Sequence, residues 1–139
     1  MAAFLLGIPF AAMVLYTQPD DIMTILDQEY DLLREELMRI NEFPMLWKKL
    51  TITGMRDISP DGVGYNVGKG AEIYVCINGP INNVMHVLLH ELAHNTVNEY
   101  DHSSAFWNNL GRLKEIAESI GIYEPIGTDV PFCNGTIGD

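Results

Sequence analysis

Apolar residues return at helical spacing in the first charged part of the chain. Behind Pro19-Asp20-Asp21, apolar side chains recur every three or four positions from Ile22 to Ile40, and charged side chains fill the positions between them. An aspartate at the start caps a helix and suits its dipole, whereas Asn41 and Pro44 interrupt the pattern. We therefore predict an amphipathic helix from about residue 20 to about residue 40.

The middle of the chain carries strand and turn patterns. Residues 50–58 are rich in β-branched side chains, and residues 72–77 have the best strand pattern of the chain. The strand at 72–77 can be part of the core, and it can also lie along a cleft where an extended peptide adds as another strand; the two interpretations are compatible. Residues 59–62 are a turn signal, and the glycines from 62 to 70 predict a loop.

The second half of the chain predicts two more helices and an irregular tail. A helix capped by Asn82 or Asn83 runs to His94, with apolar residues on one arc and histidines on the opposite arc. The last helix runs from a serine cap at 103 or 104 to a glycine stop at 121, and residues 122–139 are expected to be extended or loose. Together these elements predict a single α+β domain over residues 19–139.

The four histidines of the chain all lie between residues 86 and 102. His90 and His94 are four residues apart, so they share one helix face, and Glu91 lies beside that face. This spacing suits a zinc ion, and His102 can complete three protein ligands while a fourth position stays open for water. The pattern predicts a zinc site at which Glu91 takes the proton of an attacking water during peptide hydrolysis.

Other roles around this motif stay open. The alternative third ligands are His86, Glu99 and Asp101. His86 fits better as a residue that lines the cleft, because three successive helical turns diverge too far to close on one ion. Phe106 and Trp107 are expected in the core. The sequence does not choose among three tyrosines as donors to the oxyanion: Tyr65, Tyr100 and Tyr123.

The composition and net charge of the chain limit the classes of molecule that it can bind. The chain has 19 acidic and 8 basic residues and a net charge of −11. Such a surface repels phosphate backbones, so direct nucleic-acid binding is disfavoured, and the expected partner is a protein or peptide substrate. Cys76 and Cys133 do not have zinc-knuckle spacing, and we expect free thiols rather than one disulfide. The sequence does not predict an oligomeric state.

Residues 1–18 differ from the rest, because residues 1–17 carry no charge and are mostly apolar. As a helix this stretch would measure about 25 Å, short of the roughly 30 Å hydrocarbon core of a bilayer. Three interpretations remain open: a membrane anchor or uncleaved signal, a segment packed on the domain, or a start codon assigned too early, with Met13 or Met23 as the true start. The first predicts a membrane-associated protein, and the others an intracellular one.

Successive blocks of the chain resemble a WLM-domain zinc metallopeptidase, a family related to the SprT/Spartan proteases. The blocks are residues 64–70, residues 73–77, residues 87–95 around His90-Glu91-Leu92-Ala93-His94, and His102 followed by Phe106-Trp107. The resemblance covers residues 32–113. Two departures are Val75-Cys76-Ile77, where the family is usually rich in arginine, and Tyr100-Asp101, where a Gly-Pro commonly precedes the third histidine.

The resemblance implies a minimal zincin fold with Zn²⁺ held by His90, His94 and His102 and with Glu91 as the catalytic acid and base. It also implies a zinc-dependent endopeptidase that acts on proteins crosslinked to DNA, although the net charge of −11 weakens the second part. The competing interpretations are a zinc-stabilised protein-binding module without turnover and a membrane-tethered adaptor.

Overall fold

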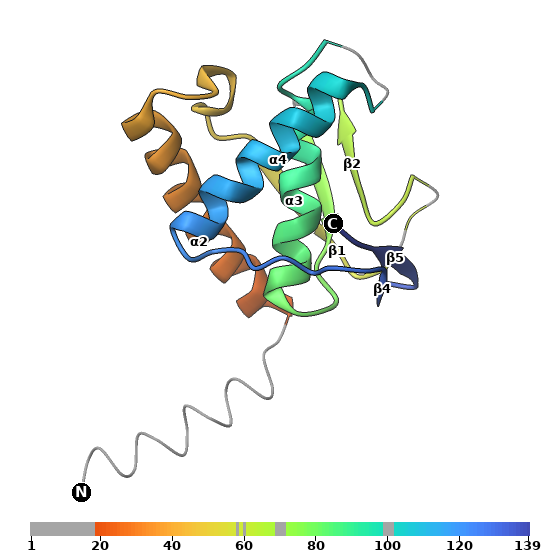
Figure 1. Ribbon diagram of the computed structural model, residues 1–139. Helices are drawn as coiled ribbons and strands as arrows, with labels where there is room; N and C mark the ends of the chain where they lie inside the picture. The colour runs from red at the N-terminus through yellow and green to blue at the C-terminus, as the bar shows by residue number, and fades with distance from the viewer. Residues whose placement is uncertain (1–18, 58, 60, 69–71, 99–101) are drawn as a thin grey trace, which may run out of the picture.

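The computed structural model describes residues 19–57, 59, 61–68, 72–98 and 102–139. Within this part the fold is α+β, with three α-helices, a three-stranded sheet and a separate two-stranded hairpin (Figure 1). The elements in chain order are α2 (Pro19–Ile40), the 3-10 turn η1 (Pro44–Leu46), β1 (Thr51–Met55), β2 (Gly64–Val67), β3 (Glu72–Cys76), α3 (Ile81–His94), α4 (Ser104–Ser119), β4 (Val130–Phe132) and β5 (Gly135–Ile137).

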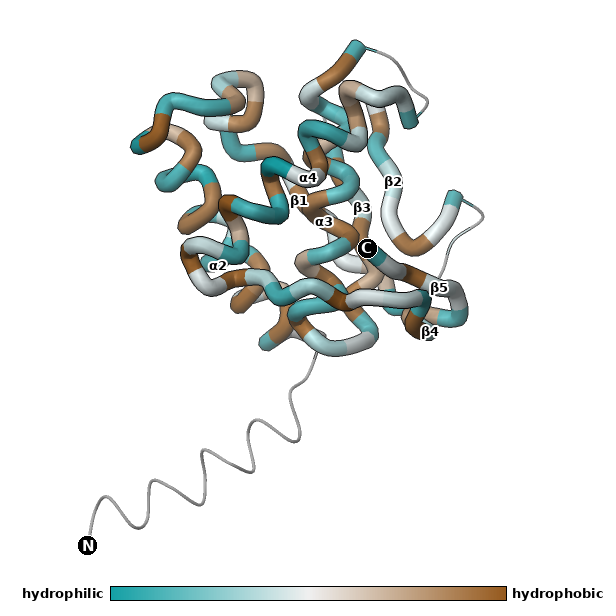
Figure 2. The backbone as a smooth tube through the Cα atoms, viewed as in Figure 1, coloured by the Kyte–Doolittle hydropathy of each residue, from teal (hydrophilic) through white to brown (hydrophobic). Residues whose placement is uncertain are grey.

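The predicted helix over residues 20–40 is confirmed as α2. Leu26, Leu33 and Leu37 are fully buried. Hydrophobic and hydrophilic residues alternate along the helix (Figure 2). Tyr30 lies in the same buried stripe, and its hydroxyl accepts a hydrogen bond from the backbone N–H of Leu50 at 3.1 Å. This contact ties the helix to the start of the sheet, because Leu50 directly precedes β1.

The sheet has the strand order β1-β3-β2, so β3 is its central strand. β1 is parallel to β3, and β2 is antiparallel to it. Two predictions are therefore wrong. The glycine-rich stretch contains strand β2 where a loop was expected, because Tyr65 can stack on Tyr74 of β3 with ring centroids 4.7 Å apart. The strand predicted at 72–77 is confirmed as β3, but it cannot accept a peptide, because both of its edges are already paired, one with β1 and the other with β2.

Helix α3 lies between the sheet and α4 (Figure 1). Its apolar arc fills the core, and Met85, Leu88, Leu89 and Leu92 are completely buried. The helix begins earlier than predicted, with Pro80 as the N-cap residue. The Asn82 side chain instead exchanges two hydrogen bonds with the backbone of residue 124, so it fastens a distant segment rather than the helix start.

Helix α4 begins as the sequence predicts. The Ser103 hydroxyl accepts a hydrogen bond from the backbone N–H of Phe106 at 3.2 Å, which is the expected capping contact. The helix ends just before Gly121, whose φ of 80° is a backbone conformation that favours glycine.

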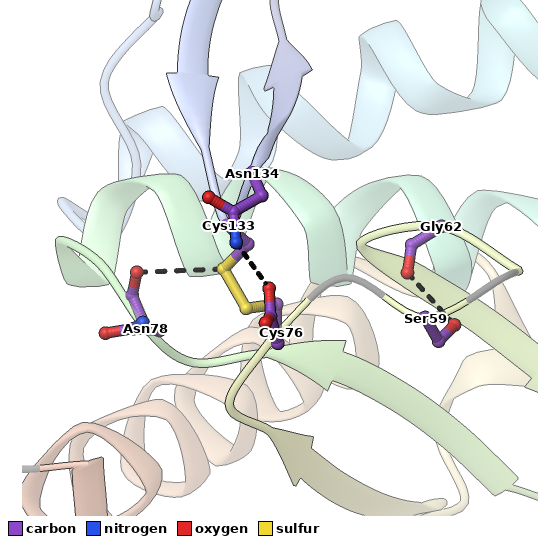
Figure 3. Close-up of a disulfide and its surroundings, with 7 residues drawn as sticks. Ser59, Gly62, Cys76, Asn78, Cys133 and Asn134 are labelled. Atoms are coloured by element: carbon purple, nitrogen blue, oxygen red, sulfur yellow. Dashed lines mark hydrogen bonds between the residues drawn. A yellow bond between two sulfur atoms is a disulfide. The ribbon is translucent and has the colours of Figure 1, made fainter.

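The tail is not loose, and the prediction of free thiols is wrong. β4 and β5 form a hairpin through a two-residue turn at Cys133 and Asn134, whose φ values of 51° and 60° fit a type I′ turn. A disulfide joins Cys133 in this turn to Cys76 at the end of β3 (Figure 3). The two cysteines are 57 positions apart, and only the folded chain brings them together.

The apolar lead at residues 1–18 and its proposed anchor role lie outside the described residues. Within the part of the chain that the structure describes, no helix has the length and apolar character needed to cross a membrane.

Candidate metal centre and adjoining cleft

Three histidines converge at one place on the molecule. His90 and His94 come from α3, and His102 comes from the segment just before α4. One ring nitrogen of each lies within 4.8 Å of those of the other two, and the Nε2 atoms of His94 and His102 are 3.1 Å apart. The structure therefore brings the three predicted metal ligands together.

The geometry and protonation of this cluster fit a metal ion. Two imidazole nitrogens on one tetrahedral zinc would be about 3.4 Å apart, close to the spacing of His94 and His102. Burial, and after it the neighbouring His94 and His102, together lower the pKa of His90 to about 3. The pKa of His94 is also lowered, first by burial and then by His102. Neutral imidazoles with free lone pairs are the form that binds a metal, so this group could hold one.

Glu91 lies on the same helix as two of these histidines and is buried, with 5% of its surface exposed. Burial raises the pKa of the Glu91 carboxyl and a hydrogen bond from Asn66 partly offsets that rise, so that the net pKa is about 7. The Asn66 amide donates to Glu91 Oε1 at 2.6 Å. A carboxyl with this pKa can both accept and donate a proton near neutral pH.

Asn66 reaches Glu91 because strand β2 runs very close to α3. A Cβ atom placed on Gly64 would lie 2.4 Å from Cγ1 of Val87 and 3.3 Å from Oε2 of Glu91, so only glycine fits there. Sequence reasoning assigned no role to Asn66, since its stretch was predicted to be a loop. The alternation that places Gly64 and Asn66 on one face of a strand was the available signal.

The aromatic pair on α4 separates into one core residue and one cleft residue. Phe106 is fully buried, and its ring stacks on His102 with centroids 4.5 Å apart. Trp107 is 52% exposed, so its predicted core position is wrong. One helical step turns its side chain away from the core, and its ring lies 5.3 Å from that of His102.

A cavity of ≈310 Å³ opens beside this cluster. Its lining includes Glu91 and His90 from α3, Trp107 from α4, and the chain around Gly64. His86 also lines it, as expected, and does not join the three-histidine group.

His86 belongs to a second polar network, one turn before His90 on α3. Its Nδ1 lies 3.0 Å from the Tyr123 hydroxyl, and the pKa of His86 is lowered, mainly by burial. The Tyr123 hydroxyl donates to Asp139 at 2.5 Å, and burial followed by this contact raises the pKa of Tyr123.

Of the candidate oxyanion donors, Tyr65 and Tyr123 lie in the part of the chain that the structure describes. The ring of Tyr65 is stacked on Tyr74, and the proton of Tyr123 is engaged by Asp139. Tyr100, Glu99 and Asp101 lie outside the described residues, so their predicted roles are not tested.

Comparisons with known proteins add a family and one relative. A family model described as the WLM domain matches residues 44–127. An uncharacterized protein of Acanthamoeba polyphaga mimivirus is 35% identical over 123 residues, and the alignment covers 77% of this chain and 59% of that protein. The chain thus spans less than two thirds of the length of this curated relative. No solved structure matches the chain.

Proposed function

The chain belongs to the WLM domain family, whose members resemble zinc metallopeptidases, and we propose that it is a zinc-dependent endopeptidase with a minimal zincin-like fold. One observation carries this proposal. Three imidazoles converge beside the carboxyl group of Glu91, which shares helix α3 with two of them, and that carboxyl lines a cavity open to a substrate. A site that only stabilised the fold would not need a titratable carboxyl buried at the edge of the cavity.

In the proposed mechanism His90, His94 and His102 hold Zn²⁺, which when bound would polarise a peptide carbonyl and lower the pKa of a water molecule. Glu91 accepts the proton of the attacking water and then donates it to the departing amine. Its pKa of about 7 suits both steps, because the carboxyl changes protonation state easily near neutral pH. Asn66 holds one carboxyl oxygen and so fixes the direction in which the other can act.

Strand β2 is the element best placed to receive the substrate. It is an edge strand of the sheet, and Gly64 at its start lines the cavity next to Glu91. An extended peptide can pair with the free side of an edge strand through backbone hydrogen bonds. The proposed substrate is therefore an extended segment of a protein, bound beside β2 with one peptide bond near Glu91.

The test is casein cleavage by zinc-loaded protein, with Glu91→Gln as the variant. Glutamine keeps the shape of the side chain but cannot take up the proton of water. We expect a loss of at least about a hundredfold in kcat, with zinc remaining near one ion per chain. The matched control is Glu115→Gln, which removes an exposed carboxylate from α4 and should leave the rate unchanged. No cleavage by either wild type or Glu91→Gln would reject the peptidase and favour a zinc-stabilised binding module, and equal measurable rates would reject the role of Glu91.

A further inference from the structure

The β4–β5 hairpin contributes one wall of the cavity beside Glu91. Thr136, Ile137 and Gly138 line this cavity together with residues of β2, α3 and α4. The matched family span ends at residue 127, before the hairpin begins at residue 130. This wall is therefore supplied by a part of the chain outside the matched domain.

The hairpin is held firmly against the domain at its turn. The disulfide between Cys133 and Cys76 joins this turn to the central strand of the sheet (Figure 3). Phe132 packs so closely on Gly79 that a Cβ atom there would lie 2.5 Å from the Phe132 ring. The Asn134 amide donates to Asp57 at 2.7 Å, which adds a contact to the connection after β1. Such a wall is preorganised for a ligand and needs little ordering when one binds.

The other end of the hairpin is fastened by the Asp139 carboxylate. One oxygen accepts hydrogen bonds from the Lys114 ammonium at 2.7 Å and from the Tyr123 hydroxyl at 2.5 Å. The second oxygen accepts from the backbone N–H groups of Ile126 and Gly127. Because both ends are fixed, Thr136 and Ile137 between them have defined positions at the cavity.

The chemistry of the lining selects an apolar ligand. Most of the side chains around the cavity are hydrocarbon or aromatic: Val63, Val87, Trp107, Leu110 and Ile137. Among the described residues that line it there is no lysine or arginine, and Glu91 disfavours a second carboxylate close by. A volume of ≈310 Å³ accommodates one large side chain rather than a folded segment.

We propose that this cavity is a specificity pocket for an apolar side chain of the substrate next to the cleaved bond, and that the β4–β5 hairpin sets the size it accepts. The proposal rests on the proposed peptidase function. Ile137 forms the apolar part of the hairpin wall, and Thr136 forms its exposed rim. A shorter side chain at Ile137 would enlarge the pocket, and a charged side chain at Thr136 would make the pocket more polar.

The experiment maps the cleavage sites of the zinc-loaded full chain in casein by mass spectrometry. A series of peptides with the sequence of one mapped cleavage site then carries different residues next to the cleaved bond. We expect wild type to cleave beside apolar residues, and Ile137→Ala to raise the kcat/KM ratio of phenylalanine over valine peptides about tenfold. Val130→Ala is the matched control, because Val130 pairs with Ile137 in the hairpin and does not line the cavity. It should keep the wild-type preference.

A second variant covers the case in which Ile137→Ala fails to fold. Thr136→Lys alters an exposed side chain, so the hairpin should remain intact. The new ammonium should shift the preference several-fold towards glutamate peptides and away from leucine peptides. Cleavage of casein with the same residue profile in wild type and both variants would overturn the pocket proposal and leave the peptidase standing.

Binding separates the pocket from the chemistry. Fluorescence anisotropy of labelled peptides on zinc-loaded Glu91→Gln reports selectivity without turnover. If wild type cleaves nothing, the peptidase is rejected. The pocket is still supported if Glu91→Gln binds leucine peptides more tightly than glutamate peptides and if adding Thr136→Lys to this variant reverses that order. Equal binding of both peptides by both proteins would reject the pocket.

Discussion

Glu91 has an environment in which two effects oppose each other. Burial favours the neutral carboxyl, and the Asn66 amide favours the carboxylate to which it donates. Their balance leaves a pKa of about 7, whereas burial alone would push it higher. Asn66 is thus a positioning residue with two consequences, since it orients one carboxyl oxygen and holds the pKa in a useful range.

Replacing Asn66 should change both the rate and its pH dependence. In Asn66→Ala the carboxyl loses a donor that lowers its pKa, so the pKa rises above about 7 and the acid limb of the kcat profile moves to higher pH. We expect a fall of roughly tenfold or more in kcat at pH 7, with less effect at pH 9. Asn109→Ala is the control, because that amide donates to Thr96 and not to Glu91. A uniform fall at every pH would show that Asn66 only supports the fold.

The three-histidine cluster predicts the metal content of single variants. On the proposed assignment, His102→Ala removes one of three zinc ligands and should reduce bound zinc well below one ion per chain after dialysis. His86→Ala should retain full stoichiometry, because His86 contacts Tyr123 instead of the cluster. Elemental analysis of both purified variants is the measurement. Full zinc in His102→Ala would move the third ligand elsewhere, with Glu99 and Asp101 as the sequence-based alternatives.

At the scale of elements, the long periodic segments and the strands β1 and β3 could be predicted, whereas β2 and the β4–β5 hairpin could not. Apolar stripes in the sequence predict helices α2 and α4, and a serine cap also marks the start of α4. Both are local signals. β2 and the β4–β5 hairpin depend on partners elsewhere: β2 needs β3 beside it and α3 beneath Gly64, and the hairpin needs Cys76. His90 and His94 could be placed from helical spacing, whereas the contribution of Asn66 required the strand.

Reduction of the disulfide should weaken the fold measurably. The bridge spans 57 positions, and closing a loop of that size removes entropy from the unfolded chain worth roughly 4 kcal/mol. Disulfides commonly deliver somewhat less than this entropic value, so we expect a loss of about 2–4 kcal/mol in the free energy of unfolding. Urea denaturation with and without a phosphine reductant, which spares zinc, measures it.

The control for this experiment is Cys76→Ser combined with Cys133→Ser. The double variant should have the lower stability from the outset and should not respond to the reductant. An unchanged urea midpoint for reduced wild type would show that the bridge does not contribute to stability.

The Asp139 contacts should make the tail sensitive to acid. Burial raises the pKa of this carboxyl, but the hydrogen bonds from Lys114, Tyr123, Gly127 and Ile126 outweigh it, and the net pKa lies below the ordinary value. A carboxyl with a lowered folded pKa contributes stability that is present above its unfolded pKa of about 3.9 and is lost as pH falls through the folded value.

Asp139→Asn should therefore destabilise the protein at pH 5–7 by roughly 1–2 kcal/mol, and the difference from wild type should shrink as the pH falls below about 4. Thermal denaturation between pH 7 and pH 2.5 provides the measurement. Asp129→Asn is the matched control on the same segment, because Asp129 is exposed. A difference that stayed constant down to pH 2.5 would mean that the charge of Asp139 contributes nothing.

At the scale of the whole molecule, a short chain places its chemistry on one central helix. α3 buries its apolar arc between the sheet and α4 and presents His90 and Glu91 to the cavity. The position of the site therefore depends on the core, and variants that loosen the core should affect the cluster. The net negative charge of the chain does not arise from the cavity, because the described lining of the cavity is mainly apolar.

The net charge of −11 bears directly on DNA as a partner. Non-specific DNA binding draws its free energy from neutralised phosphates and released counterions, and it reaches dissociation constants of roughly 10⁻⁴–10⁻⁶ M for proteins that present basic surfaces. A chain with 19 acidic and 8 basic residues has few cationic side chains with which to neutralise phosphates.

We expect no binding of labelled single- or double-stranded DNA below about 100 µM at 150 mM salt, and no stimulation of casein cleavage by added DNA. Fluorescence anisotropy, with a basic DNA-binding domain as the positive control, measures the first. Micromolar binding that weakens steeply with salt would reveal a local basic surface strong enough to overcome the global charge, and would restore DNA-crosslinked proteins as the leading substrate class.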